Sequence, residues 1–479
     1  MVETKHTERN KNTEKSLYSY SEMNTQTDHT LSGAPNGGWG WVIVAAVALI
    51  NMFNASITSV FGLLFGEQLE IISHGTSTPA LLANLNSLAL NFSGLFIGPA
   101  IKSFAPRKVT SFGIILISLG LALCGFATEV WQFALGYGLM VGIGLGLISP
   151  STFMIINSYF TTKKARAVGI TLAGTGIGQI IIPHIVRVLL ENYGYQHAVF
   201  GVSLLSLVGL FGASFFSPLK SSPITSNPND NKEVKTLLTA PIEEPNKTVL
   251  SQRPQTKQEN STFWGKVFNY VIKAMDLELL KDYAFWSIIV GMGLVYTATI
   301  NFSMLFPYFL QNSVHLNKSD TALCMSMVAS ADLISRLLLP FATEKLQVPS
   351  RVVFLFGTIG LLISRAALAE TTDITSLLVL SALTGITKSA TVLNNNLAIS
   401  EYVRPEKLAG GLGLNMITKA ILVISVGSFL GWIRDFTESY ILCLHVQNIF
   451  LGLVIVVWTP EILNKMWRRN GKGVLDSAV

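Results

Sequence analysis

The sequence has few charged residues and few cysteines for its 479 residues. Asp, Glu, Lys and Arg make up 13% of the chain, whereas soluble proteins average about 25%. With 50% hydrophobic residues and a mean hydropathy of +0.48, this deficit excludes an ordinary soluble domain and indicates a helical protein that crosses a membrane many times. The three cysteines, Cys124, Cys324 and Cys443, lie inside apolar runs. Their spacing suggests neither a disulfide framework nor a metal site.

Other signals are absent as well. The net charge of +6 comes from basic residues between apolar runs, which is the pattern of cytoplasmic loops and not of nucleic-acid binding. The first 35 residues are polar and contain no apolar core for a cleavable signal peptide, so we expect the first span to act as its own signal anchor. Because no cofactor motif, nucleophile elbow or metal-ligand spacing occurs, we expect no cofactor and no enzymatic activity.

What the sequence does contain is twelve apolar runs, six before and six after a polar segment. The first three lie at about 40–65, 79–101 and 109–127. The fourth begins near 130, and the fifth ends near 190. The others lie at about 197–216, 285–310, 321–342, 352–369, 374–402, 410–433 and 440–458. We therefore expect an all-α polytopic membrane protein with twelve transmembrane helices in two six-helix halves, 36–216 and 284–460. This is the organisation of the major facilitator fold.

The polar segments are predicted to be a disordered tail (1–35), a mostly disordered linker (217–283) and a short tail (461–479). Alternating apolar and charged residues near 262–281 predict an amphipathic helix at the end of the linker. Lys and Arg concentrate in these segments and in the loops after the second, fourth, eighth and tenth runs. We therefore expect a multi-pass plasma-membrane protein with both termini in the cytoplasm.

Five glycines in the fourth run, Gly136, Gly138, Gly142, Gly144 and Gly146, lie at two- and four-residue spacings. Small residues at these spacings let helix backbones approach closely. Since no strand precedes them and no phosphate motif follows, we interpret them as a packing surface and not as a ligand loop.

A carboxylate and a guanidinium, Asp332 and Arg336, lie four residues apart in the run from about 321 to 342. This spacing puts them on one helix face. Each charge costs roughly 2.5–3.5 kcal/mol at a bilayer centre on insertion scales, so such residues face the bundle interior and usually serve a substrate or ion. An internal ion pair that holds helices together is the alternative.

Three motifs resemble those of the monocarboxylate transporter family. Residues 36–41 read Asn-Gly-Gly-Trp-Gly-Trp and match the family's entry to the first span, except that Asn36 replaces an acid. Residues 159–174 carry Tyr-Phe, a Lys-Lys pair and a Gly/Ala pattern, as the family does before its fifth span. Asp332 and Arg336 match its eighth span.

The resemblance implies transport of a small carboxylate, often together with a proton. If the resemblance holds, Arg336 would bind the substrate carboxylate and Asp332 would carry or couple the proton. Phe306 would be an aromatic residue of the pocket. The implied partners are a small organic anion or zwitterion, protons, the lipid bilayer and a single-span accessory glycoprotein.

Departures from the family pattern concern three positions. Ser59 stands where proton-coupled lactate carriers have a lysine, and no lysine lies between residues 41 and 65. Lys388 stands in place of a bulky apolar pocket residue, and Lys419 in place of an acid. We expect Lys388 to supply the missing positive charge, with Lys419 second. Pairing of Lys388 with a carboxylate is the alternative.

The sequence therefore leaves three hypotheses. The first is a secondary transporter that moves a small monocarboxylate or related solute by alternating access, with proton coupling open. The second is a non-transporting sensor or scaffold with a transporter-like fold. The third is a facilitative carrier for an amino acid or other zwitterion.

Overall fold

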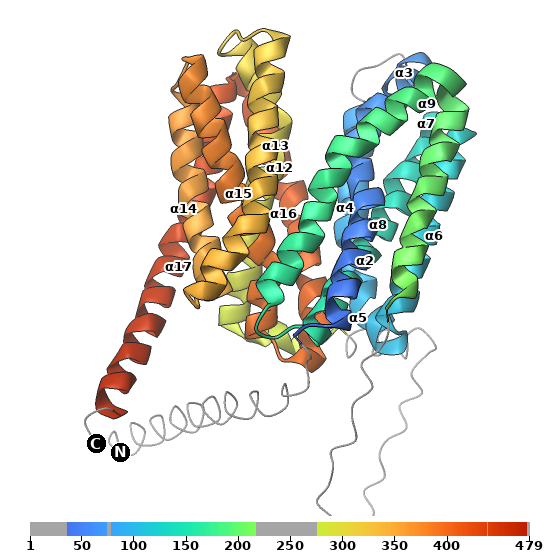
Figure 1. Cartoon of the computed structure of the whole chain (residues 1–479). Helices are drawn as coiled ribbons and strands as arrows, with labels where there is room; N and C mark the ends of the chain where they lie inside the picture. Colours follow the sequence, from blue (N-terminus) through green and yellow to red (C-terminus); the bar gives the residue numbers. More distant parts are fainter. Residues whose placement is uncertain (1–35, 74–77, 217–274, 438, 477–479) are drawn as a thin grey trace, which may run out of the picture. The chain divides into compact units, whose positions relative to one another are not determined.

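The computed structural model describes residues 36–73, 78–216, 275–437 and 439–476. Within these ranges every regular element is a helix, and none is a β-strand (Figure 1). The predicted disordered tail (1–35) and most of the linker, including residues 262–274 of the predicted amphipathic helix, lie outside the described residues. The described end of that segment contains only a short 3₁₀ helix, η3 (Leu277–Lys281).

The first half, coloured blue to green in Figure 1, contains six spans. Its elements are α2 (Trp39–Phe53), η1 (Ala55–Val60), α3 (Phe61–Ser73), α4 (Thr78–Phe92), α5 (Gly94–Ser103), α6 (Pro106–Gly125), α7 (Val130–Phe133), η2 (Ala134–Val141), α8 (Gly142–Tyr159) and α9 (Lys164–Ser214). At 51 residues α9 is too long for one crossing. It reverses at Gly194, whose φ of 73° suits glycine.

The second half, coloured yellow to red, supplies the other six spans. Its elements are α12 (Tyr283–Asn312), α13 (Lys318–Lys345), α14 (Ser350–Ala369), α15 (Ile374–Tyr402), η4 (Pro405–Lys407), α16 (Leu408–Thr437) and α17 (Tyr440–Asp476). Helix α17 continues through Pro460 to Asp476, into the segment 461–479 that the sequence predicted to be a tail.

The predicted number of twelve transmembrane helices is confirmed for the described residues. Ten helical segments are long and apolar enough to cross a membrane, and the pair α4–α5, bent by 41°, makes one more span. The last span comes from α9, because the break at Gly194 divides it into two crossings.

Side-chain caps fix where several of the second-half helices begin. The Asp282 side chain accepts a hydrogen bond from the Ala284 amide at the start of α12. The Asn317 side chain accepts one from the Asp320 backbone amide at the start of α13. Asp373 accepts from the Ser376 amide and hydroxyl at the start of α15, and these bonds lower the pKa of its carboxyl group. Each cap satisfies an amide that the first helical turn leaves unpaired.

The glycines of the fourth span form the packing surface that the sequence predicted. A Cβ added to Gly136 would lie 2.6 Å from the Gly120 carbonyl oxygen, and one added to Gly144 would lie 2.7 Å from that of Gly113. Real Cβ atoms do not approach so closely, so only glycine permits this contact between η2–α8 and α6.

The two halves interlock at one end of the bundle. We call it the basic end, because it carries the connections 104–105, 160–163, 346–349 and 403–404, with Lys or Arg beside each. Here α5 crosses α16 at two glycines, and a Cβ on Gly413 would lie 2.5 Å from the Gly94 carbonyl oxygen. The ion pair Arg166–Glu344 also joins the halves, and Lys102 pairs with Asp276 (2.6 Å), which lies shortly before α12. The conformation is therefore one in which the basic end is closed.

Candidate substrate-binding cavity

A cavity of about 290 Å³ lies between the two halves. Helices α2, α4, α8 and α9 contribute side chains from the first half, and α12, α14, α15 and α16 from the second. Its polar lining consists of Asn51, Asn91, Ser149, Thr152, Thr171, Thr175, Tyr296, Thr299, Thr391, Asn395, Asn396 and Lys419. Lys419 is the single charged side chain among the lining residues.

Lys419 is 8% exposed and forms no ion pair with any described carboxylate. Its Nζ lies 4.9 Å from the centre of the Tyr296 ring, which attracts the charge without neutralising it. The Asn91 amide donates a hydrogen bond of 3.3 Å to the Tyr296 hydroxyl. Since Asn91 belongs to the first half and Tyr296 to the second, this contact crosses the interface. The Lys419 amine therefore has no carboxylate partner among the described residues and can contact a ligand.

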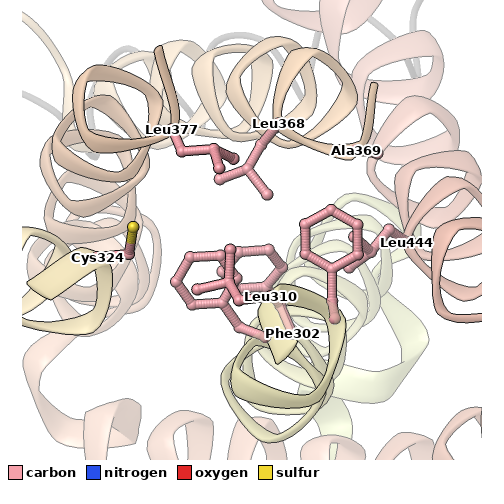
Figure 2. Close-up of a cluster of buried hydrophobic side chains, with 9 residues drawn as sticks. Phe302, Leu310, Cys324, Leu368, Ala369, Leu377 and Leu444 are labelled. Carbon is pink, nitrogen blue, oxygen red and sulfur yellow. The ribbon is translucent and has the colours of Figure 1, made fainter. Parts of the chain in front are cut away.

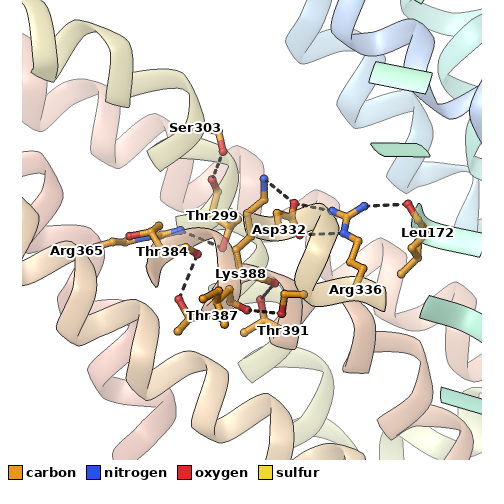
Figure 3. Close-up of polar contacts among 12 residues, drawn as sticks. Leu172, Thr299, Ser303, Asp332, Arg336, Arg365, Thr384, Thr387, Lys388 and Thr391 are labelled. Carbon is orange, nitrogen blue, oxygen red and sulfur yellow. Dashed lines mark hydrogen bonds and ion pairs between the residues drawn. The ribbon is translucent and has the colours of Figure 1, made fainter. Parts of the chain in front are cut away.

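Asp332, Arg336 and Lys388 form a cluster that we call the charge trio (Figure 3). Arg336 donates to Asp332 through Nε and Nη2, at 2.9 and 2.8 Å. Lys388 Nζ lies 3.5 Å from the Asp332 carboxylate. The predicted pair is thus present, and the structure places Lys388 as a second cation on the same carboxylate, which was the alternative interpretation of Lys388.

The third arm of the Arg336 guanidinium reaches the other half. Its Nη1 donates to the Leu172 carbonyl of α9 at 3.1 Å (Figure 3). Gly169 on α9 leaves room for the Arg336 backbone. Leu172 and Thr391 line the cavity, but no member of the charge trio does. The trio borders the cavity, and each of the three Arg336 nitrogens donates a hydrogen bond within the protein.

Arg365 on α14 is 1% exposed. Its guanidinium donates to the Ala298 carbonyl at 3.2 Å and stacks on Phe302 at 4.2 Å. It also donates to the Thr299 hydroxyl at 3.4 Å, and Thr299 lines the cavity. An arginine inside an apolar run was the available signal, but its depth depends on how α14 packs.

The other two predicted site residues lie elsewhere. Phe306 belongs to an apolar cluster with Phe302, whose ring centre is 4.9 Å away, and with Leu310, Leu368 and other residues (Figure 2). Ser59 is an exposed residue of η1, and its hydroxyl donates to the Ser56 carbonyl at 2.6 Å. Neither residue lines the cavity. Sequence reasoning instead missed Tyr296 and the lining asparagines, because uncharged polar residues are common in helices that pack within a bundle.

Comparison with known proteins agrees with this architecture. Residues 43–428 match the family model described as Major Facilitator Superfamily. Among curated proteins, monocarboxylate transporter 12 of Mus musculus is 24% identical over 91% of this chain and 89% of its own. Monocarboxylate transporter 13 of Rattus norvegicus is 24% identical over 90% and 91%.

Among solved structures, the proton:xylose symporter XylE, bound to 6-bromo-6-deoxy-D-glucose, is similar with a TM-score of 0.65. The two are 12% identical, and the match covers 88% of this chain and 96% of that one. At this identity the similarity shows the fold alone.

Proposed function

The chain belongs to the major facilitator superfamily of transporters, and we propose that it moves a small organic monoanion across the plasma membrane by alternating access. The observation that supports this proposal is Lys419, an unneutralised cation in the cavity between the halves. The names of the relatives, monocarboxylate transporters 12 and 13, agree with a carboxylate as the ligand.

The electrostatics favour an anion. At an effective dielectric constant of about 20, a carboxylate about 4 Å from Lys419 gains roughly 4 kcal/mol before desolvation. The cation–π contact with Tyr296 is worth only about 0.5–2 kcal/mol, so a carboxylate can draw the ammonium away from the ring. A bound monoanion would leave the cavity lining neutral.

The charge trio has a different role in this proposal. With its guanidinium shared between Asp332 and the Leu172 carbonyl, Arg336 holds α13 against α9 and stabilises the state closed at the basic end. Protonation of Asp332 would release both cations, and this is the step at which a proton could be coupled to the movement of the halves. The carboxylate-holding role that the family resemblance implies for Arg336 would require this release first.

We further propose that the basic end faces the cytoplasm, because Lys and Arg flank cytoplasmic connections in membrane proteins. The described conformation is then closed on the cytoplasmic side. A single-span accessory glycoprotein is a partner that the family resemblance suggests for delivery to the surface.

Zwitterion carriage and a non-transporting scaffold are the alternatives. The cavity lining contains no carboxylate to pair with a substrate ammonium group, which favours an anion over a zwitterion. A scaffold gains nothing from an unneutralised buried lysine.

Uptake by the full chain in proteoliposomes at pH 6 and pH 7.5 tests the proposal with labelled monocarboxylates and amino acids. We expect saturable uptake of a monocarboxylate over empty liposomes. Uptake of amino acids alone would establish the zwitterion carrier, and no saturable uptake by correctly folded protein would establish the scaffold.

A further inference from the structure

Seven uncharged side chains of the cavity wall donate a hydrogen bond within the protein and also carry an acceptor oxygen. The side chains that show this are three asparagines and four threonines on both halves of the molecule. In each, one donor hydrogen is used by the protein itself, and an acceptor oxygen keeps a lone pair for the cavity. These acceptors indicate the chemistry of the part of the substrate that lies beyond its carboxylate.

Two asparagines of the first half have fixed orientations. The Nδ2 of Asn51 donates to the Thr171 carbonyl at 2.9 Å, and that of Asn91 donates to the Ser87 carbonyl at 2.8 Å and to Tyr296. Because a backbone carbonyl can only accept, the nitrogen of each amide must be the atom that faces it. Neither amide oxygen has a donor among the described residues, so both oxygens are free to accept from a ligand.

The second half contributes the Asn395–Asn396 pair. The Nδ2 of Asn395 donates to the Asn396 oxygen at 2.9 Å, which leaves the Asn395 oxygen as an acceptor and the Asn396 nitrogen as a donor. Reversing both amides would again leave one acceptor and one donor on this pair, with the acceptor on Asn396.

The lining threonines add further acceptors. Their hydroxyl protons are used within their own helices, where each hydroxyl donates to a carbonyl three or four residues earlier: Thr152 to Ile148, Thr171 to Val168, Thr299 to Val295 and Thr391 to Lys388. A threonine that bonds back in this way keeps lone pairs for its surroundings; one lone pair of Thr299 already accepts from Arg365.

The charge of the lining residues limits the net charge that a substrate can carry. The lining contains one cation and no carboxylate, so a monoanion neutralises it, whereas a dianion leaves one negative charge without a partner. A zwitterion leaves the charge of Lys419 uncompensated, because its own ammonium cancels its carboxylate. Buried charges without partners are unfavourable.

We propose that the substrate is a monocarboxylate whose body carries several uncharged hydrogen-bond donors, namely hydroxyl or amide N–H groups. Its carboxylate binds Lys419, and its donors bind the oxygens of Asn51, Asn91 and Asn395. A plain aliphatic acid leaves these oxygens without partners once water is displaced, which lowers its affinity. This inference rests on the proposed function and adds the chemistry of the substrate's uncharged end.

Binding to the purified full chain in detergent tests this with six-carbon ligands that differ in one property at a time. Gluconate and galactonate are monoanions rich in hydroxyls, and hexanoate is a monoanion without them. Glucarate is a dianion, sorbitol is neutral, and norleucine is a zwitterion. Titration calorimetry gives the affinities and avoids the free passage of hexanoic acid through lipid.

We expect the better aldonate to bind at least tenfold more tightly than hexanoate, and both to bind more tightly than glucarate, sorbitol or norleucine. Asn51→Leu and Asn395→Leu should each weaken aldonate binding about 5- to 10-fold and leave hexanoate unchanged. Asn192→Leu is the matched control, because Asn192 is exposed, makes the same amide-to-carbonyl bond (2.8 Å, to Val188) and does not line the cavity. It should change neither affinity.

The outcomes separate the inference from the proposed function. If hexanoate binds as tightly as the aldonates and Lys419→Met weakens both, the anion transporter stands and the inference is refuted. Tightest binding of glucarate or norleucine also refutes the inference. If no anion binds more tightly than sorbitol, the proposed function itself fails.

Discussion

Within the described part of the chain, Asp332 is the one carboxylate that pairs with two intramembrane cations, Arg336 and Lys388, and this makes a sharp prediction for its removal. Asp332→Asn keeps the shape of the side chain and removes its charge. The exposed fractions of the three side chains are 8% for Asp332, 11% for Arg336 and 26% for Lys388. Solvent therefore compensates little for the loss.

The magnitude follows from the distances. At an effective dielectric constant of about 20, the 2.8 Å contact with Arg336 corresponds to roughly 6 kcal/mol and the 3.5 Å contact with Lys388 to roughly 5 kcal/mol, both before desolvation. Desolvation offsets much of this, and removing one partner of a buried pair costs about 3–5 kcal/mol in measured cases. We expect Asp332→Asn to destabilise the protein by about that amount.

The assay is the thermal midpoint of the purified protein in detergent, followed by size-exclusion chromatography. Lys388→Met alone is the control, because it leaves the bidentate Arg336–Asp332 pair intact and should cost less than about 1.5 kcal/mol. Adding Lys388→Met to Asp332→Asn removes one of the two stranded cations and should recover part of the loss. The reasoning is refuted if Asp332→Asn has the midpoint of the wild type, or if the double variant is less stable than the single one.

Three further predictions concern the interface and the topology. Gly413→Val should weaken the closed basic end, because its Cβ would lie 2.5 Å from the Gly94 carbonyl; a cysteine introduced near the cavity should then react faster with a reagent added from that end, and an unchanged rate would contradict this. Arg336→Lys should slow transport several-fold with KM within threefold of wild type, since lysine keeps the charge but loses the planar fork that reaches Leu172; a large rise in KM would instead make Arg336 a substrate ligand. An epitope tag inserted at Asn246 should bind antibody only after cells are permeabilised, and labelling of intact cells would reverse the proposed orientation.

Much of the fold could be predicted, because bilayer thickness and hydrophobic periodicity act on each span separately. Each of the twelve spans is recognised from the length of its own apolar run. The packing role of the fourth-span glycines and the Asp332–Arg336 contact follow from the spacing of residues along a single helix. The limits of α17 were harder to predict, because Pro460 ends an apolar run without ending the helix.

The site was less predictable, because it depends on the relative depth and rotation of different helices. The distance between Lys388 on α15 and Asp332 on α13 is set by how the two helices pack, and no spacing in the sequence encodes it. The same is true of Phe306: the packing of α12 places its side chain inside an apolar cluster. Lys419 was recognised as a buried cation, but its lack of a carboxylate partner could be seen only when its neighbours were placed.

The most direct test of the account compares two lysines in one uptake assay. Lys419→Met and Lys388→Met each remove one intramembrane cation and replace it with a side chain of similar length. If Lys419 holds the substrate carboxylate, Lys419→Met should raise the KM for an anionic substrate more than tenfold at equal protein in the liposomes, while Lys388→Met should leave KM within threefold. Loss of anion binding in Lys388→Met, with normal KM in Lys419→Met, would contradict the central claim and assign the substrate to the charge trio.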